Sequence, residues 1–197
     1  NELLEKLIYY IRQFYGDEPE KSPDYPRIVR LEAVTRLERL MQKGKIIYGG
    51  KIIPEDKFVA PTILENVSPD DAVMQEEIFG PLLPVVEFHH LDEAIGYINA
   101  REKPLALYYF GTAAVAKAVI AKTSSGGVCI NDTVMHISNS RLPFGGVGHS
   151  GMGRYHGFES FSTFSNRRSV LSSPTWWDVP LKYPPYRNFK LLKKFIK

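Results

Sequence analysis

Two amphipathic patterns open the chain and predict helices. Leucine, isoleucine and aromatic residues recur at intervals of three and four over residues 3–15, and Gly16 follows as a C-terminal stop. A second set with the same spacing covers residues 31–41 and ends before Gly44. We therefore expect two helices, and we expect the first to bury one face.

After Gly44 the pattern changes to short β-prone runs. The first two cover residues 45–48 and 58–64 and are separated by glycines and a proline. Strands are then expected at 83–88, 105–110 and 128–131, and helices at 91–99 and 113–122. Strands that alternate with helices of about ten residues are typical of βαβ units. We predict an α/β fold with a parallel sheet covered on both faces.

Six of the fifteen residues from Pro143 to Gly157 are glycine, which is too dense for a helix or a strand. We predict a loop here. In parallel α/β sheets, ligands bind beyond the carboxyl ends of the strands. Because this stretch follows the strand predicted at 128–131, we expect it to lie at that edge and to form part of a site. A tightly turned connector is the alternative.

The C-terminal region carries three further expectations. Phe158, Phe161 and Phe164 are spaced as on a short helix, and 162–172 resembles an extended strand. Since no later strand follows, we expect that strand to pair with another sheet or another subunit. Residues 189–197 mix apolar side chains with four lysines. They predict either a frayed terminus or a short helix on an anionic membrane surface.

Charge and cysteine content narrow the function classes. Residues 182–197 hold six of the 25 basic residues and no acid, so the remaining 19 basic residues face 22 acids. Nucleic-acid binding has little support because no basic stripe crosses the body. No apolar run is long enough to span a membrane. The single cysteine, Cys129, excludes an intrachain disulfide and fits a reducing, cytoplasmic location.

Few side chains qualify as nucleophiles or metal ligands. Cys129 lies in an apolar strand with no histidine or lysine beside it in sequence, which predicts a buried structural thiol. His136 and His156 are candidates for orienting a substrate, with hydrogen bonds to local backbone groups as the alternative. The pair at 89–90 is interpreted as solvated surface. Without a second cysteine or a spaced His/Asp cluster, we expect no metal site.

One motif links these observations to a known family. Alone, Glu76-Glu77-Ile78-Phe79-Gly80-Pro81 predicts a solvated Glu77 and a core Phe79. It is followed by Ser-Gly-Gly-Val-x-x-Asn and then by Pro-Phe-Gly-Gly-x-Gly-x-Ser-Gly-x-Gly. Together these motifs resemble the C-terminal half of the NAD(P)-dependent aldehyde dehydrogenases, from the first helix to about residue 172. The variants at 73–81, 101–108, 131–136 and 151–157 resemble the class 3 branch, which includes fatty-aldehyde and benzaldehyde dehydrogenases.

The resemblance implies cofactor-binding and substrate-pocket residues. The family oxidises aldehydes to acids through a cysteine thiohemiacetal and thioester, with hydride passed to NAD or NADP. Glu77 matches the acid that binds the nicotinamide ribose, and Phe79 matches the aromatic beside the nicotinamide. Matches to the class 3 aldehyde pocket are Phe144, His156, Val134 and Ser138. These assignments imply that Glu77, Phe79 and Phe144 face one cleft.

The resemblance also implies what lies outside the chain. The family's nucleophilic cysteine, general-base glutamate and dinucleotide-binding domain precede the matching segment. We therefore expect the nucleophile and the general base upstream of Asn1, and no catalytic residue within the chain itself. Because the chemistry needs both groups, the isolated chain is expected to be inactive.

The expected organisation follows from the same resemblance. Residues 1–160 should form part of the catalytic domain, 161–173 an oligomerisation strand and 174–197 a basic tail. The expected partners are an aldehyde and either an identical chain or the N-terminal half. A non-catalytic interaction module is the alternative.

Overall fold

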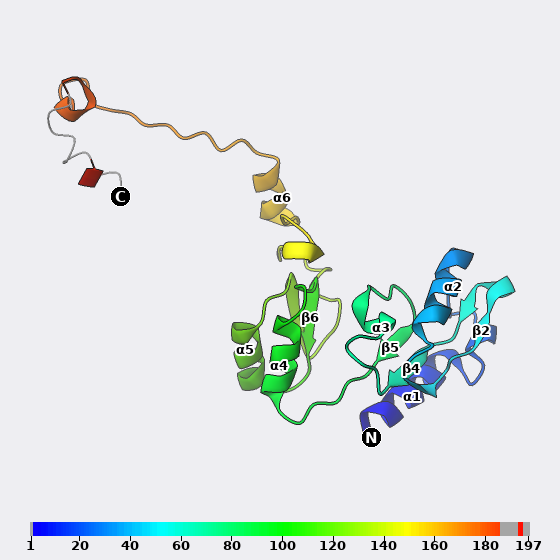
Figure 1. Cartoon of the computed structure of the whole chain (residues 1–197). Helices are drawn as coiled ribbons and strands as arrows, with labels where there is room; N and C mark the ends of the chain where they lie inside the picture. The colour runs from blue at the N-terminus through cyan, green and yellow to red at the C-terminus, as the bar shows by residue number, and fades with distance from the viewer. Residues whose placement is uncertain (1, 186–192, 195–197) are drawn as a thin grey trace. The chain divides into compact units, whose positions relative to one another are not determined.

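The computed structural model describes residues 2–185 and 193–194. The chain divides into two compact units, residues 1–94 and 95–197, each of which is described by itself (Figure 1). Both predicted N-terminal helices are present, as α1 (Glu2–Tyr15) and α2 (Leu31–Leu40). Gly16 ends α1 with a φ of 77°, and its N–H donates to the Arg12 carbonyl at 2.8 Å. This is the left-handed conformation that glycine adopts at helix ends.

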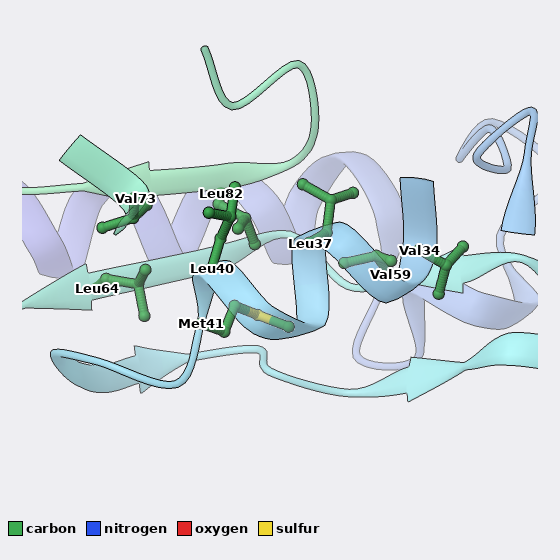
Figure 2. Packing of buried hydrophobic residues seen from close by; sticks show 8 residues of the cluster. All are labelled: Val34, Leu37, Leu40, Met41, Val59, Leu64, Val73 and Leu82. Carbon is green, nitrogen blue, oxygen red and sulfur yellow. The ribbon is translucent and has the colours of Figure 1, made fainter. Parts of the chain in front are cut away.

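The two helices differ in how much of their apolar surface is buried. In α1, Leu4 is buried and Leu7, Ile8, Ile11 and Tyr15 on the same face are half-buried, while Phe14 remains 65% exposed, so the face expected to be buried is covered only in part. In α2, Val34, Leu37 and Leu40 are at most 1% exposed. They form the core of the first unit together with Met41, Val59, Leu64, Val73 and Leu82 (Figure 2). Helix α2 is therefore the fixed support on which neighbouring loops rest.

The strands of the first unit are short and mostly antiparallel. The elements after α2 are β1 (Lys45–Tyr48), β2 (Ile52–Ile53), β3 (Phe58–Val59), β4 (Thr62–Glu65), α3 (Ala72–Gln75) and β5 (Leu82–Pro84). Strand β4 pairs antiparallel with β1 and parallel with β5, and β2 pairs antiparallel with β3. The predicted run at 58–64 is split at Pro61, which has no N–H for a strand ladder. Strand β5 stops at Pro84, four residues before the predicted end.

The second unit contains the predicted βαβ arrangement. Its elements are α4 (Leu91–Asn99), which crosses the boundary between the units, β6 (Ala106–Tyr109), α5 (Ala113–Lys122) and β7 (Gly127–Ile130). Strands β6 and β7 are parallel, from Ala106 opposite Gly127 to Tyr109 opposite Ile130. At their carboxyl ends the Asn131 amide exchanges two hydrogen bonds with the Gly111 backbone, at 2.8 and 3.1 Å.

The single parallel sheet that the pattern predicted is only partly present. The described residues form a mixed three-stranded sheet, an antiparallel pair and a parallel pair. The α/β content and the parallel pairs β4/β5 and β6/β7 are confirmed. The antiparallel pairs β1/β4 and β2/β3 are the exceptions, because no crossover α-helix lies between the two strands of either pair.

The C-terminal region begins with the predicted short helix, α6 (Gly157–Thr163). Residues 162–163 belong to this helix, so the expectation of an extended strand from 162 is wrong at its start. From 166 to 174 the chain is exposed and carries no assigned element, and Figure 1 draws it as an extended stretch. Except for 193–194, the tail prediction for 189–197 lies outside the described residues. None of the described helices is long and apolar enough to cross a bilayer.

Candidate functional site

The Glu76–Pro81 segment is a loop between α3 and β5 that presents two side chains to solvent. Phe79 is 84% exposed, and its φ of 43° lies in the left-handed region. Glu77 is exposed as well, and its carboxylate has no hydrogen-bond partner among the described residues. The loop ends where the Thr62 N–H of β4 donates to the Pro81 carbonyl at 2.8 Å. The alternative that Phe79 is a core residue is therefore wrong.

Helix α2 holds this loop through two neighbouring residues. The Arg36 guanidinium donates to the carbonyls of Glu77 and Ile78, at 3.0 and 2.5 Å. Gly80 lies so close to α2 that an added Cβ would be 2.5 Å from Leu37 Cδ2. The loop backbone is therefore fixed by α2, while the side chains of Glu77 and Phe79 remain free.

In the second unit, Phe144 is the centre of an aromatic cluster. Its backbone pairs with that of Tyr155, with N–H to carbonyl distances of 3.0 and 2.9 Å. The His156 ring stacks on the Phe144 ring at 5.9 Å, Tyr155 lies edge-on at 5.5 Å, and His136 is tilted at 5.8 Å. The structure thus brings together two of the predicted pocket residues, Phe144 and His156, in one half-buried apolar wall.

Cys129 has a histidine partner that its sequence neighbours do not reveal. The thiol is buried, as predicted, but its Sγ lies 3.2 Å from His136 Nδ1. The ring of His136 fits there because Gly127 has no side chain. An added Cβ on Gly127 would lie 2.6 Å from His136 Cδ2. For His136 and His156, the alternative to orienting a substrate is hydrogen bonding to local backbone groups. That alternative is not confirmed for His136 Nε2 or His156 Nδ1, since both atoms are buried without a hydrogen bond in the described structure.

Val134 and Ser138 lie in the loop that follows β7. Val134 is 54% exposed and has a φ of 62°. The Ser138 hydroxyl donates to the Met135 carbonyl at 2.8 Å, so its hydrogen bond is local to a turn. For both residues the role in an aldehyde pocket stays a prediction.

The glycine-rich stretch is a loop, as predicted, but it lies at the other end of its strand. An added Cβ on Gly126, the residue before β7, would be 2.4 Å from the Gly145 carbonyl. Arg154 donates from one nitrogen to the carbonyls of Gly126 and Gly145, at 2.6 and 3.0 Å. Farther along the loop, His149 contacts Glu102, which precedes β6. The segment after Asn131 therefore returns along β7 toward the amino end of that strand. The expectation that residues 143–157 lie at the carboxyl end of β7 is wrong.

Sequence reasoning missed the residues that hold these loops. The missed interactions all join positions at least seven residues apart: the hydrogen bonds of Arg36, those of Arg154, and the contact between His136 and Cys129. No periodicity marks them, because each acts through a backbone carbonyl or a single side-chain contact. The described residues contain no group of three or more His, Cys, Asp or Glu that could hold a metal.

The catalytic groups themselves were expected before the first residue of the chain. Asn1 lies outside the described residues, and the described structure begins at Glu2, the first residue of α1. The placement of a nucleophilic cysteine and a general-base glutamate upstream of Asn1 therefore stays a prediction. Within the described residues, the candidate binding residues form two groups, the loop at 76–81 in the first unit and the aromatic cluster around Phe144 in the second.

The two units define an α/β protein in which exposed side chains lie on loops whose backbones are held by arginine hydrogen bonds. The chain belongs to the aldehyde dehydrogenase family, whose pattern it matches over residues 1–170. It is 52% identical over 195 residues to rat "Aldehyde dehydrogenase family 3 member B1", covering 96% of this chain and 42% of the relative. It is also 52% identical over 172 residues to mouse "Aldehyde dehydrogenase, dimeric NADP-preferring", covering 87% and 38%.

A solved structure agrees with these relatives. The structure of Staphylococcus aureus AldH in its substrate-bound state has a TM-score of 0.84 and 45% identity to this chain, covering 100% of this chain and 44% of that one. The chain thus spans about two fifths of the length of the relatives it matches. The expectation that Glu77, Phe79 and Phe144 face one cleft concerns both units and stays a prediction.

Proposed function

We propose that this chain is the C-terminal part of the catalytic domain of a class 3 aldehyde dehydrogenase, and that it contributes residues for cofactor and aldehyde binding. The observation that carries the proposal is the exposed pair Glu77 and Phe79 on a loop whose backbone is fixed. Membership of the aldehyde dehydrogenase family supports the proposal. So do relatives named as family 3 members, such as the rat protein that is 52% identical to this chain.

The residues of this loop fit NAD or NADP chemically. A carboxylate with unused acceptor sites can accept from both hydroxyls of a ribose, and an exposed phenyl offers a face to the nicotinamide ring. When bound, NAD(P) accepts the hydride that leaves the aldehyde carbon. In this proposal Glu77 binds and orients the ribose, and Phe79 limits the positions open to the ring.

The aromatic cluster of the second unit fits an apolar aldehyde. The rings of Phe144 and His156 form one wall, and we assign Val134 and Ser138 to the same pocket by family resemblance. Aromatic and aliphatic walls exclude water and bind hydrocarbon chains or rings. This pocket would favour medium-chain or aromatic aldehydes over acetaldehyde.

We assign no nucleophilic role to Cys129. Cys129 is only 8% exposed and its Sγ lies against His136, so an aldehyde carbon cannot reach the thiol without local opening. In this proposal the nucleophilic cysteine and the general-base glutamate are supplied by residues outside these 197, as they are in the family. The isolated chain is then expected to bind its ligands poorly and to show no turnover.

A chimera tests the proposal. This chain would replace the matching C-terminal part of the rat relative, and aldehyde-dependent formation of NAD(P)H would be measured. We expect turnover that Glu77→Gln weakens, with KM for the cofactor raised by about tenfold or more, because charge-assisted hydrogen bonds contribute about 1.5–3 kcal/mol. Glu55→Gln, an exposed glutamate of the same unit, is the matched control. An active chimera that is indifferent to Glu77→Gln would contradict the cofactor assignment.

A second candidate function is pairing with another chain through residues 164–173. Val170 and Leu171 are 82% and 92% exposed there, and exposed backbone of this kind can add to the edge of a second sheet. The word "dimeric" in the name of the mouse relative supports this candidate. Light scattering after size-exclusion chromatography should show a dimer that truncation before residue 164 dissociates. A monomer at all concentrations would refute it.

A further inference from the structure

The loop that carries Glu77 and Phe79 has a conformation that its own sequence does not favour. Phe79 adopts a φ of 43°, a region that bulky side chains enter only when surrounding contacts impose it. The side chain of Phe79 is 84% exposed, so its own packing does not impose that conformation. The constraint must come from contacts to the neighbouring backbone.

Those contacts come from Arg36. Its two terminal nitrogens donate to the carbonyls of Glu77 and Ile78, at 3.0 and 2.5 Å. These carbonyls belong to the two successive peptide groups that connect Glu77 to Phe79. One planar guanidinium therefore orients both peptide planes at once, which a lysine ammonium cannot do with the same geometry.

Arg36 is itself held on a rigid element. The residues around it on α2, Val34, Leu37 and Leu40, are at most 1% exposed and belong to the core. Ile78 packs against the same core cluster from the loop side. Two side chains thus lock the middle of the loop, and the residues on either side of Ile78 are turned outward.

We propose that Arg36 is a positioning residue, which sets the placement of the Glu77 carboxylate and the Phe79 ring and thereby the affinity for the cofactor. This inference rests on the proposed function for its consequence, but its geometric part does not. Because the loop is held before any ligand binds, little ordering entropy is lost on binding. Removing Arg36 should therefore weaken cofactor binding without touching the cofactor-binding side chains.

Arg39 provides a matched control. It lies one turn further along α2 and pairs with the Glu76 side chain at 2.5 Å instead of with loop carbonyls. Both partners are well exposed, and exposed ion pairs contribute little to stability. A substitution at Arg39 removes the same charge from the same helix but leaves the two peptide planes held.

The first arm of the test uses nuclear magnetic resonance on the full 197-residue chain labelled with ¹⁵N. In wild type we expect amide order parameters of about 0.8 for Ile78 and Phe79, and in Arg36→Met values below about 0.6. Arg36→Gln, which keeps one donor group, should lie between them, and Arg39→Met should match wild type. If Arg36→Met does not fold, Arg36→Gln decides. Unchanged order parameters and shifts at residues 77–79 would overturn the inference.

The second arm uses the chimera with the rat relative. Arg36→Met should raise KM for NAD(P) about tenfold, because the loop must then be ordered when the cofactor binds, while KM for the aldehyde stays within about twofold. Arg39→Met should change neither. A loosened loop with an unchanged cofactor KM would overturn the role in binding. A wild-type chimera that does not use NAD(P) would instead refute the proposed function, and the first arm would still decide whether Arg36 positions the loop.

Discussion

The close approach of Gly80 to α2 leads to a sharp prediction about packing under the candidate cofactor loop. An alanine at position 80 would place its Cβ 2.5 and 2.7 Å from the two methyl carbons of Leu37. Methyl groups at a chain end normally move aside, but Leu37 is 0% exposed and surrounded by the core cluster. Gly80→Ala should therefore destabilise the first unit by about 1–3 kcal/mol, the usual cost of overpacking a core.

The same geometry predicts that the cost depends on Leu37. Leu37→Ala alone should cost about 2–5 kcal/mol, because it leaves a cavity in a fully buried site. In that background, the methyl group of Gly80→Ala enters space that the leucine has vacated. The second substitution should then cost nothing or recover part of the loss. The coupling free energy between the two positions should be at least about 1 kcal/mol in favour of the double variant.

Urea unfolding followed by circular dichroism measures this cycle, with the slope against urea concentration checked for constancy. Leu4→Ala is the control, since Leu4 is also buried in the first unit but lies outside the core cluster around Leu37. Gly80→Ala and Leu4→Ala should be additive within about 0.5 kcal/mol. If Gly80→Ala and Leu37→Ala were also additive, the contact between α2 and the loop would not have the geometry described.

Two further predictions concern other parts of the chain. Burial raises the pKa of the Tyr25 phenol above its ordinary value, so its contribution to stability is full below about pH 10 and is lost as pH rises through the raised pKa. Tyr25→Phe should lower the free energy of unfolding by about 1–3 kcal/mol at pH 7, because it removes the hydrogen bond that the phenol donates to the buried Val59 carbonyl of β3. Urea unfolding should also show that raising the pH above 10 destabilises Tyr25→Phe less than it destabilises wild type. Gly127→Ala should displace the His136 ring that covers Cys129. Overpacking of about 1–3 kcal/mol makes opening of the site easier, so Cys129 should react with a thiol reagent at least about tenfold faster. Gly96→Ala, with open space around it, should leave that rate unchanged.

The elements whose signals are local in sequence were predictable. Helices α4 and α5 begin and end where the pattern places them, because acids occupy the first turn of α4 and Thr112 accepts a hydrogen bond from the Val115 N–H at the start of α5. The parallel pairing of β6 with β7 also follows from one helix lying between two apolar runs. In each case the decisive interactions lie within a few residues of one another.

The features that sequence reasoning missed depend on distant contacts. The glycine-rich loop was placed at the carboxyl end of β7 because it follows that strand in the chain, yet Gly126 and Arg154 bring it to the amino end. The outward face of Phe79 was also not predictable from hydrophobicity, which favours burial of a phenyl ring. It follows instead from hydrogen bonds that Arg36 makes across some 40 residues of sequence.

The two candidate binding loops are held by the same physical device. In the first unit Arg36 joins the carbonyls of Glu77 and Ile78, and in the second Arg154 joins those of Gly126 and Gly145. A guanidinium that bonds two backbone carbonyls fixes loop shape while leaving the loop's own side chains free for a ligand. Substitutions at these arginines should therefore alter ligand affinity through loop order, whereas substitutions at the presented side chains should alter it with loop order unchanged. Combining dynamics with binding measurements separates the two, and neither measurement does so alone.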